Sequence, residues 1–368
     1  MREWYDIDNI EEIDTPALVV YLDRVKENIR VLKNFVPDTS RLRPHVKTNK
    51  SEEVSKLIID AGITKFKCAT ISEAEMLALA GAKDVLLAYQ PVGPKATRLL
   101  ALKEKYPATQ FSCLIDNLET ANHLSDIFMN ANERIPVYID LNIGMNRTGV
   151  TPQKAYTLYL GCQTLKGIMV IGLHAYDGHI RDTDFELRTK HSDESFAPVE
   201  ILATKILKNH SGPFTVIAGG TPTFPIHSKR KDVECSPGTF IYWDMGYQRI
   251  LPEQPFVFAA LVITRVISKP TEDTLCVDLG HKSIASENPI DSRVFFLNAP
   301  ELQPIGHSEE HMVVRAPATN SYNVGDVLYG VPFHICPTCA LYDSAWIVEN
   351  NHVRQKWAIS SRNRTITI

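Results

Sequence analysis

Basic residues occupy every second position at the start of the segment RLRPHVKTNKS (41–51): they are Arg41, Arg43, His45 and Lys47. If residues 41–47 form a strand, alternation puts these side chains on one face and the intervening apolar residues on the other. A lysine desolvated beside other cations has a lowered pKa, which favours the neutral amine needed to form a Schiff base. Lys47 is therefore a candidate covalent catalyst. A basic patch on an edge strand explains this segment alone equally well.

Two glycine-containing segments could bind a phosphate. AGGTPTF (218–224) and ECSPGTF (234–240) both offer backbone N–H groups beside Thr or Ser hydroxyls, the groups that bind phosphates in proteins. Each segment alone is more commonly an ordinary turn. Together with a candidate Schiff-base lysine they suggest pyridoxal 5'-phosphate, which requires a lysine, a phosphate site and contacts to its ring.

The strands that would position these residues alternate with helix-like stretches, as in a parallel sheet or barrel. Eight candidate strands can be counted, at 41–47, 65–70, 84–90, 110–116, 136–142, 169–176, 214–220 and 232–240. Eight such units predict a (β/α)8 barrel, with an open doubly wound sheet as the main alternative. In a barrel, Lys47 ends the first strand at the catalytic rim. The phosphate-binding segments then lie at strands seven and eight, where barrels most often bind phosphate.

The chain changes character after about residue 245, where Pro-punctuated β-rich segments replace the alternating pattern. These segments predict a second, β-type domain. The apolar run PALVVYL (16–22) would overfill an eight-stranded barrel, so we assign it to that domain. The predicted organisation is an α/β fold in which residues 24–245 form the barrel, and residues 1–23 and 246–368 form the β domain.

Further ring contacts could come from two other predicted strand ends. Arg147 follows the strand at 136–142, in NIGMNRTGV, and His174 and Tyr176 share one face of the strand at 169–176. His174 could stack on a cofactor ring, although a lone histidine on a strand is more often a hydrogen-bonded core residue.

Composition excludes several classes of protein. The net charge is −4, and no basic block or aromatic-basic pattern suggests nucleic-acid binding. The N-terminus lacks a signal-peptide pattern, and the longest apolar run, FVFAALVI, is too short to span a bilayer. Seven scattered cysteines fit reduced thiols better than a disulfide framework. These observations predict a soluble cytoplasmic protein.

Most of the chain resembles the fold-type III pyridoxal-phosphate enzymes, of which alanine racemase is the founding member. The match is closest to the D-threonine aldolase and D-serine dehydratase branch. It is carried by DTPALVV, RPHVKTNK, AYQPVGP, GMNRTGV, AYDGH, GGTPTF, SPGTF, VDLGHK, SEEHM and HICPT. The resemblance implies that Lys47 bonds the cofactor and that Arg147 with His174 or Tyr176 contacts its ring. It also implies phosphate contacts from Gly219, Gly220, Thr221, Gly238 and Thr239.

One position departs from alanine racemases, which carry an arginine on the last barrel strand that bonds the pyridine nitrogen. The corresponding residue here is Ser236, which weakens racemase as the activity. In the predicted barrel, Arg41, Arg43 and His45 form a supporting column for Lys47 below the cofactor.

A candidate metal site lies in HICPTC (334–339). If residues 331–336 form a strand, His334 and Cys336 point to the same side and could bind one divalent ion, with water or substrate completing the shell. The CxxC formed by Cys336 and Cys339 is weak evidence for redox chemistry without a thioredoxin-like setting. The resemblance leaves the metal open, because this dehydratase branch uses His-x-Cys for zinc whereas well-known D-threonine aldolases use His-x-Asp for manganese or a related ion.

Three functions remain open at this stage. The first is an aldolase that cleaves β-hydroxy-D-amino acids to glycine and an aldehyde, with His179 as candidate base for the hydroxyl proton; AYDGH favours it. The second is a D-serine or D-threonine dehydratase giving a 2-oxo acid and ammonia, which HIC favours. The third is a non-catalytic cofactor carrier, against which the β domain argues. We favour the aldolase, a lyase; the resemblance also implies a homodimer.

Overall fold

The computed structural model describes residues 2–368 and divides into two compact units. The barrel unit comprises Leu32–Lys47, Glu52–Gly238 and Asn363–Ile368. The β unit comprises the described residues up to Val31, together with Thr48–Ser51 and Thr239–Arg362. Relative to the predicted barrel of residues 24–245, residues 24–31 and 239–245 group with the β unit, and residues 363–368 group with the barrel unit.

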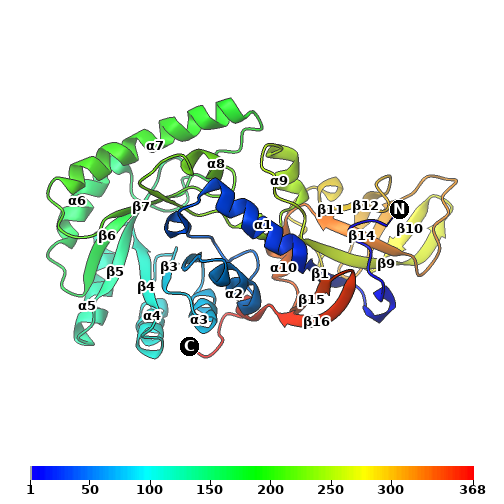
Figure 1. The fold of residues 1–368 in the computed structure, drawn as a ribbon, viewed down its shortest axis with the longest axis horizontal. Coiled ribbons are helices and arrows are strands. Elements are labelled where there is room, and N and C mark those ends of the chain that lie inside the picture. The colour runs from blue at the N-terminus through cyan, green and yellow to red at the C-terminus, as the bar shows by residue number, and fades with distance from the viewer. Residues whose placement is uncertain (1) are drawn as a thin grey trace. The chain divides into compact units, whose positions relative to one another are not determined.

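The barrel unit contains a parallel sheet whose seven strands follow one another in chain order (Figure 1). The strands are β2 (Lys65–Cys68), β3 (Asp84–Leu87), β4 (Gln110–Ile115), β5 (Ile135–Leu141), β6 (Ile168–Ala175), β7 (Thr215–Ala218) and β8 (Val233–Cys235). Nearly all of their residues are buried, as expected for parallel strands covered by helices. This TIM-like sheet agrees with the predicted barrel.

Helices connect successive strands and contact one another in chain order (Figure 1). They are α2 (Glu52–Asp60), α3 (Ile71–Ala80), α4 (Pro94–Lys105), α5 (Leu118–Asn130), α6 (Pro152–Cys162), α7 (Phe185–Leu207) and the short α8 (Phe224–His227). Local sequence explains their ends. Thr70 caps α3 by accepting a hydrogen bond from the N–H of Glu73, and Gly81 ends it in the left-handed conformation, at φ 92°.

The predicted first strand, residues 41–47, is wrong as a regular strand. Its start belongs to the 3-10 helix η2 (Thr39–Arg41), and only two isolated parallel bridges follow, Leu42 with Cys235 and His45 with Lys67. Pro44 has no N–H to donate, which interrupts the hydrogen-bond ladder at this point. Because the bridges reach both β8 and β2, the segment still joins the two edges of the sheet.

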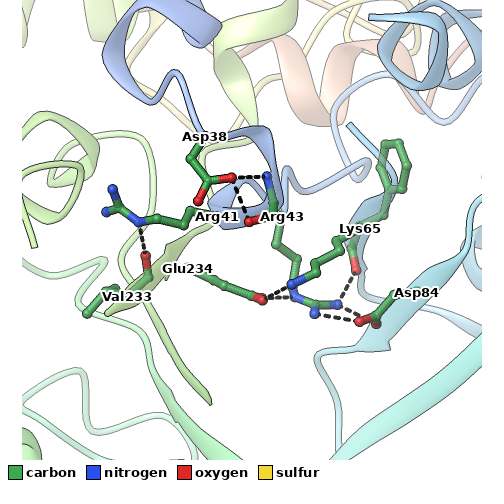
Figure 2. A network of polar contacts seen from close by, with 9 residues as sticks. Asp38, Arg41, Arg43, Lys65, Asp84, Val233 and Glu234 are labelled. Carbon is green, nitrogen blue, oxygen red and sulfur yellow. Dashed lines mark hydrogen bonds and ion pairs between the residues drawn. The ribbon is translucent and has the colours of Figure 1, made fainter. Parts of the chain in front are cut away.

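Arg41 and Arg43, which were predicted to form a column of cations that supports Lys47, contact other residues of the barrel (Figure 2). Arg41 donates to the carbonyl oxygen of Val233 at 3.2 Å. Arg43 is 1% exposed and forms ion pairs with Asp84 on β3, at 2.7 Å, and with Glu234 on β8, at 2.6 Å. Although burial lowers the pKa of Arg43, these two carboxylates raise it above its ordinary value. Both arginines therefore join neighbouring segments of the barrel, and their support of Lys47 below a cofactor stays a prediction.

The β unit contains a nine-stranded, mostly antiparallel sheet. Its strands are β1 (Ala17–Tyr21), β9 (Ala260–Thr271), β10 (Thr274–Val277), β11 (Val294–Phe296), β12 (Gln303–His307), β13 (Met312–Arg315), β14 (Val327–Pro332), β15 (Ser344–Glu349) and β16 (His352–Ala358). Strand β1 lies between β9 and β15, so the assignment of the N-terminal strand to the β-rich domain is confirmed.

The remaining elements are short, except for the first helix. The helices are α1 (Leu22–Phe35), α9 (Met245–Ile250) and α10 (Ile335–Cys339), and the further 3-10 helices are η1 (Ile10–Glu12), η3 (Thr239–Ile241), η4 (Ile290–Ser292) and η5 (Ser360–Arg362). All seven cysteines are free. Across residues 2–368, no helix has the length and apolar character needed to cross a membrane.

Candidate active site

A cavity of about 650 Å³ in the barrel unit brings together most of the predicted ring-contacting residues. Its lining includes His45, Lys47, Arg147, His174 and Tyr176. These residues come from the closing segment and from the C-terminal end of β6 and the loop after β5, where barrel enzymes place their active sites. The cavity is therefore the candidate active site.

His45 and Lys47 are adjacent on the closing segment. The backbone N–H of Lys47 donates to Nδ1 of His45 at 3.1 Å, which fixes the orientation of that imidazole beside the lysine. Lys47 lies in the cavity lining, as its predicted place at the end of the first barrel segment requires.

His174 is held by a carboxylate on the neighbouring strand. Its Nδ1 lies 2.7 Å from Oδ1 of Asp140, and Oδ2 of the same carboxylate accepts hydrogen bonds from Thr148 and Gln90, each at 2.9 Å. Burial and the charge of Lys67 lower the pKa of His174, and Asp140 offsets only part of this effect. Although burial raises the pKa of Asp140, its hydrogen bonds lower it overall, so this carboxylate stays ionised.

Arg147 and Tyr176 pack against each other at the cavity. The guanidinium carbon of Arg147 lies 5.0 Å from the centre of the Tyr176 ring, within the range of a cation–π contact. Gly149 shapes the Arg147 loop: it has φ 97°, and its N–H donates to Asp116 at 3.1 Å. A side chain at Gly149 would meet the backbone of Asn142 at 2.6 Å, which explains the glycine in GMNRTGV.

The predicted phosphate site lies where β7 and β8 end. The N–H of Gly238 donates to the hydroxyl of Thr221 at 3.2 Å, so the two glycine-containing segments touch each other. Gly219 has φ 76°, and a Cβ there would lie 2.6 Å from the His227 ring. A Cβ on Gly220 would lie 2.9 Å from the Tyr176 ring, which places this segment beside the cavity. Thr239 groups with the β unit, where its hydroxyl lies 3.6 Å from Sγ of Cys336.

A buried carboxylate–imidazole pair, Asp177 and His227, supports the Gly219 turn. Oδ2 of Asp177 lies 2.8 Å from Nε2 of His227, and Oδ1 accepts the Thr223 hydroxyl at 2.7 Å. The Thr223 oxygen in turn accepts the N–H of Gly220 at 3.4 Å. Although burial raises the pKa of Asp177, its partners, His227 foremost, lower it overall. The turn predicted to bind the phosphate is thus connected by hydrogen bonds to the buried Asp177–His227 pair.

These features fit pyridoxal phosphate. Within residues 2–368, Nε2 of His174 and the hydroxyl of Ser236 are buried without a hydrogen-bond partner. Such atoms are costly unless a ligand satisfies them. The same cavity contains Lys47, and the adjacent glycine turn has no room for further side chains. A lysine for the covalent bond and a turn for the phosphate are what pyridoxal phosphate requires.

His179, the predicted base, lies outside this cavity. Its side chain is exposed and lines a separate depression with Arg181, Asp182 and His191. A Cβ on Gly144 would lie 2.5 Å from its ring, so His179 packs on the loop after β5. Its role as a base stays a prediction.

The predicted strand over residues 331–336, from which the metal pair was inferred, is wrong. The side chains of His334 and Cys336 nevertheless interact. Strand β14 ends at Pro332, and His334 precedes helix α10, so residues 331–336 are not one strand. Burial lowers the pKa of His334, but a hydrogen bond with Cys336 and another with Glu287, at 2.5 Å, raise it to about 9. Sγ of Cys336 also lies 3.1 Å from the Thr48 hydroxyl.

The side chains of His334 and Cys336 are thus the two candidate ligands at this place. Among residues 2–368, no group of three or more His, Cys, Asp or Glu side chains could hold a metal ion. Burial raises the pKa of the Cys339 thiol well above its ordinary value, which disfavours the thiolate form at the second cysteine of the CxxC. A metal at His334 and Cys336 would take its remaining ligands from water or substrate, the pattern of a catalytic site.

Sequence reasoning missed several polar residues of the site, among them Lys67, Gln90, Asp116 and Asp140. Alternation within KFKCAT was an available signal for Lys67, because it puts Lys65 and Lys67 on the face opposite Phe66 and Cys68. Gln90 donates to both Asp116, at 3.0 Å, and Asp140, at 2.9 Å, which no local pattern indicates.

Comparison with known proteins agrees with this geometry. The family described as "Alanine racemase, N-terminal domain" matches residues 20–245, and the family described as "Putative serine dehydratase domain" matches residues 259–348. The chain is 28% identical over 365 residues to a D-threonine aldolase of an Arthrobacter species, covering 96% of this chain and 94% of that protein.

Two further matches extend over nearly the whole chain. A 3-hydroxy-D-aspartate aldolase of Paracoccus denitrificans is 28% identical over 367 residues, covering 96% of this chain and 93% of that protein. The crystal structure of a D-threonine aldolase from Filomicrobium marinum superposes with a TM-score of 0.87 at 27% identity, covering 98% of this chain and 99% of that one. These relatives are lyases, in agreement with the predicted class. The chain thus belongs to the alanine racemase N-terminal domain family, whose fold and cofactor the cavity around Lys47 had already indicated.

Proposed function

We propose that this protein is a pyridoxal-phosphate-dependent lyase that cleaves β-hydroxy-D-amino acids of the D-threonine type to glycine and an aldehyde. The observation that carries this proposal is the cavity in which Lys47 lies with His45, Arg147, His174 and Tyr176. Its substrate class follows the aldolase relatives, which match this chain over almost its full length.

Each cavity residue has a distinct task in this proposal. Lys47 would supply the amine that holds the cofactor covalently. Nε2 of His174 faces the cofactor, held in place by Asp140, and Arg147 and Tyr176 enclose the ring. The amides of Gly219, Gly220 and Gly238, with the hydroxyls of Thr221 and Thr239, bind the phosphate, and Ser236 lies near the pyridine nitrogen. When bound, pyridoxal phosphate supplies an acceptor for the electrons released as the Cα–Cβ bond breaks.

His334 and Cys336 would hold a divalent ion, zinc or manganese, which supplies a Lewis acid for the substrate's β-hydroxyl. Thr48, whose hydroxyl lies 3.1 Å from Sγ of Cys336 in the β unit, directly follows Lys47 in the sequence. His179 is the candidate base that takes the hydroxyl proton, directly or through a water.

A dehydratase is the second candidate function. The serine dehydratase domain match over residues 259–348 and the His-x-Cys pair favour it. In that reaction Lys47 takes the α-proton, the β-hydroxyl leaves, and the products are a 2-oxo acid and ammonia. Two other functions are less well supported. Racemase activity is disfavoured because Ser236 replaces the racemase arginine, and a non-catalytic cofactor carrier is disfavoured because it would not need the β unit.

One assay separates the candidates. Purified protein is incubated with pyridoxal phosphate, D-threonine and either Zn²⁺ or Mn²⁺, and the products are identified by chromatography. Glycine with acetaldehyde supports the aldolase, and 2-oxobutanoate with ammonia supports the dehydratase. Neither product pair, with bound cofactor confirmed by absorbance, contradicts both. Light scattering on the same protein tests the homodimer that the family resemblance implies.

A further inference from the structure

Lys67 is a second lysine in the active-site cavity and has no role in the proposed reaction. It lies within β2, is 4% exposed, and lines the cavity together with Lys47. Its backbone forms the bridge with His45, so the two lysine-bearing segments are hydrogen-bonded neighbours. A buried strand position normally holds an apolar residue, and a buried lysine is costly unless it is paired.

Lys65, on the same strand, is a lysine with a structural role and can be compared with Lys67. It lies two residues before Lys67 on the same face, is about one-third exposed, and forms an ion pair with Glu234 (Figure 2). The Nζ of Lys67, in contrast, makes no hydrogen bond and no ion pair with any residue in the range 2–368. The charged form of this amine therefore has no anion paired with it among these residues, and a molecule bound in the cavity can supply one.

The carboxylates around Lys67 are already engaged by other groups. Asp140 binds His174, Thr148 and Gln90, and Asp177 binds His227 and Thr223. Lys67 instead lies with its Nζ 5.5 Å from the centre of the Tyr176 ring, which Arg147 also contacts at 5.0 Å. Two cations thus share one aromatic ring inside the cavity, with no anion of their own.

The groups facing Lys67 come from three places. Lys47 and His45 lie on the closing segment, Asp140 and Arg147 on β5 and its loop, and His174, Tyr176 and Asp177 on β6 and its loop. Burial and Lys47 lower the pKa of Lys67, Asp140 and Asp177 raise it, Arg147 lowers it, and the result is a pKa of about 7. In the free cavity the Lys67 amine is therefore about half charged at pH 7.

We propose that Lys67 is an anion-binding residue of the active site, which together with Arg147 holds an anionic oxygen of the molecule bound in the cavity. The identity of that molecule rests on the proposed function. The oxygen belongs either to the pyridoxal phosphate ring or to the carboxylate of the amino-acid substrate, and both offer the same chemistry to an ammonium group.

An anion next to Lys67 favours its charged form, so binding takes up a proton. Since the free amine has a pKa of about 7, it is about 0.1 charged at pH 8, and anion binding at that pH takes up about 0.9 proton per site. Above pH 7, the affinity for the anion then falls by up to about tenfold per pH unit. A structural lysine would change neither quantity.

Isothermal titration calorimetry at pH 8, in buffers of different ionisation enthalpy, measures this proton uptake. Pyridoxal phosphate is titrated into cofactor-free protein in one arm, and D-threonine into the metal-depleted holoenzyme in the other. Comparing wild type with Lys67→Met in each arm isolates the contribution of Lys67 from that of Lys47. We expect Lys67→Met to lose about 0.9 proton in one arm, which identifies the source of the oxygen, and to weaken binding in that arm at least tenfold.

Two more variants serve as controls for the proton-uptake measurement. Lys67→Arg keeps a permanent cation, so it retains affinity but shows neither the proton uptake nor its pH dependence. Lys65→Met, on the same face of β2, leaves the proton count unchanged. Equal proton uptake by wild type and Lys67→Met in both arms overturns the inference while leaving the proposed function intact. Wild-type protein that binds no pyridoxal phosphate overturns both.

Discussion

Nδ1 of His174 lies 2.7 Å from Oδ1 of Asp140, and the two residues are register partners on β6 and β5. The ionised carboxylate accepts the Nδ1 proton, which leaves Nε2 as the atom of the ring that faces the cavity. Since Nε2 has no hydrogen-bond partner in residues 2–368, this pair prepares one oriented atom for a ligand.

Replacing Asp140 with Asn should remove the charged acceptor that orients the His174 ring. A hydrogen bond to a charged group contributes about 1.5–3 kcal/mol, so we expect turnover to fall about 10–100-fold while cofactor binding persists. Steady-state kinetics and the visible spectrum test this. Asp193→Asn, at a surface ion pair with Arg230, is the control and should behave as wild type. Equal turnover in both variants would contradict a positioning role for Asp140.

Lys47→Ala should abolish the visible absorbance of bound pyridoxal phosphate. In the proposal, the covalent bond to this amine gives the cofactor its band. Absorbance after reconstitution measures the effect, and Lys56→Ala, at a surface pair with Glu52, is the control. A surviving band in Lys47→Ala would mean that another amine bonds the cofactor.

Arg43→Met should destabilise the barrel strongly. The substitution leaves Glu234 and Asp84 without their buried partner, which typically costs about 3–5 kcal/mol. Urea unfolding followed by circular dichroism measures the loss. Arg30→Met, which breaks the exposed pair with Glu27, should leave the unfolding midpoint unchanged. Similar midpoints for the two variants would show that the network in Figure 2 contributes little.

Gly219→Ala should weaken cofactor binding. The alanine must adopt φ 76° and its Cβ would lie 2.6 Å from the buried His227 ring, so the phosphate-binding turn has to move. We expect the Kd for pyridoxal phosphate to rise about tenfold or more, corresponding to about 1.4 kcal/mol. Gly212→Ala is a matched control, because Gly212 has φ 108° but no atom within 4 Å of an added Cβ. It should share the backbone strain and keep normal cofactor affinity.

Removal of the metal should stop turnover without releasing the cofactor. Treatment with a chelator should abolish activity while the visible band persists, and either Zn²⁺ or Mn²⁺ should restore it. His334→Ala and Cys336→Ala should bind less metal by elemental analysis, whereas Cys339→Ala should not, because its thiol is buried. Full metal content in the Cys336 variant would exclude that thiol as a ligand.

Local sequence patterns were sufficient for the barrel strands, because buried parallel strands are short apolar runs bounded by helix caps. They were insufficient for Arg43, whose partners Asp84 and Glu234 are 41 and 191 residues away in the chain. Alternation also predicted a strand through Pro44, where the missing N–H prevents one. Helix α10 has only five residues, too few to produce a helical pattern in HICPTC.

The path of the chain between the two units has a consequence for how such a protein can be altered. The polypeptide passes from one unit to the other after residues 31, 47, 51, 238 and 362. The four residues Thr48–Ser51, counted with the β unit, directly follow the cofactor lysine. No single cut therefore yields either unit as a continuous piece. Exchanging one complete unit for that of another protein therefore requires a junction directly after Lys47.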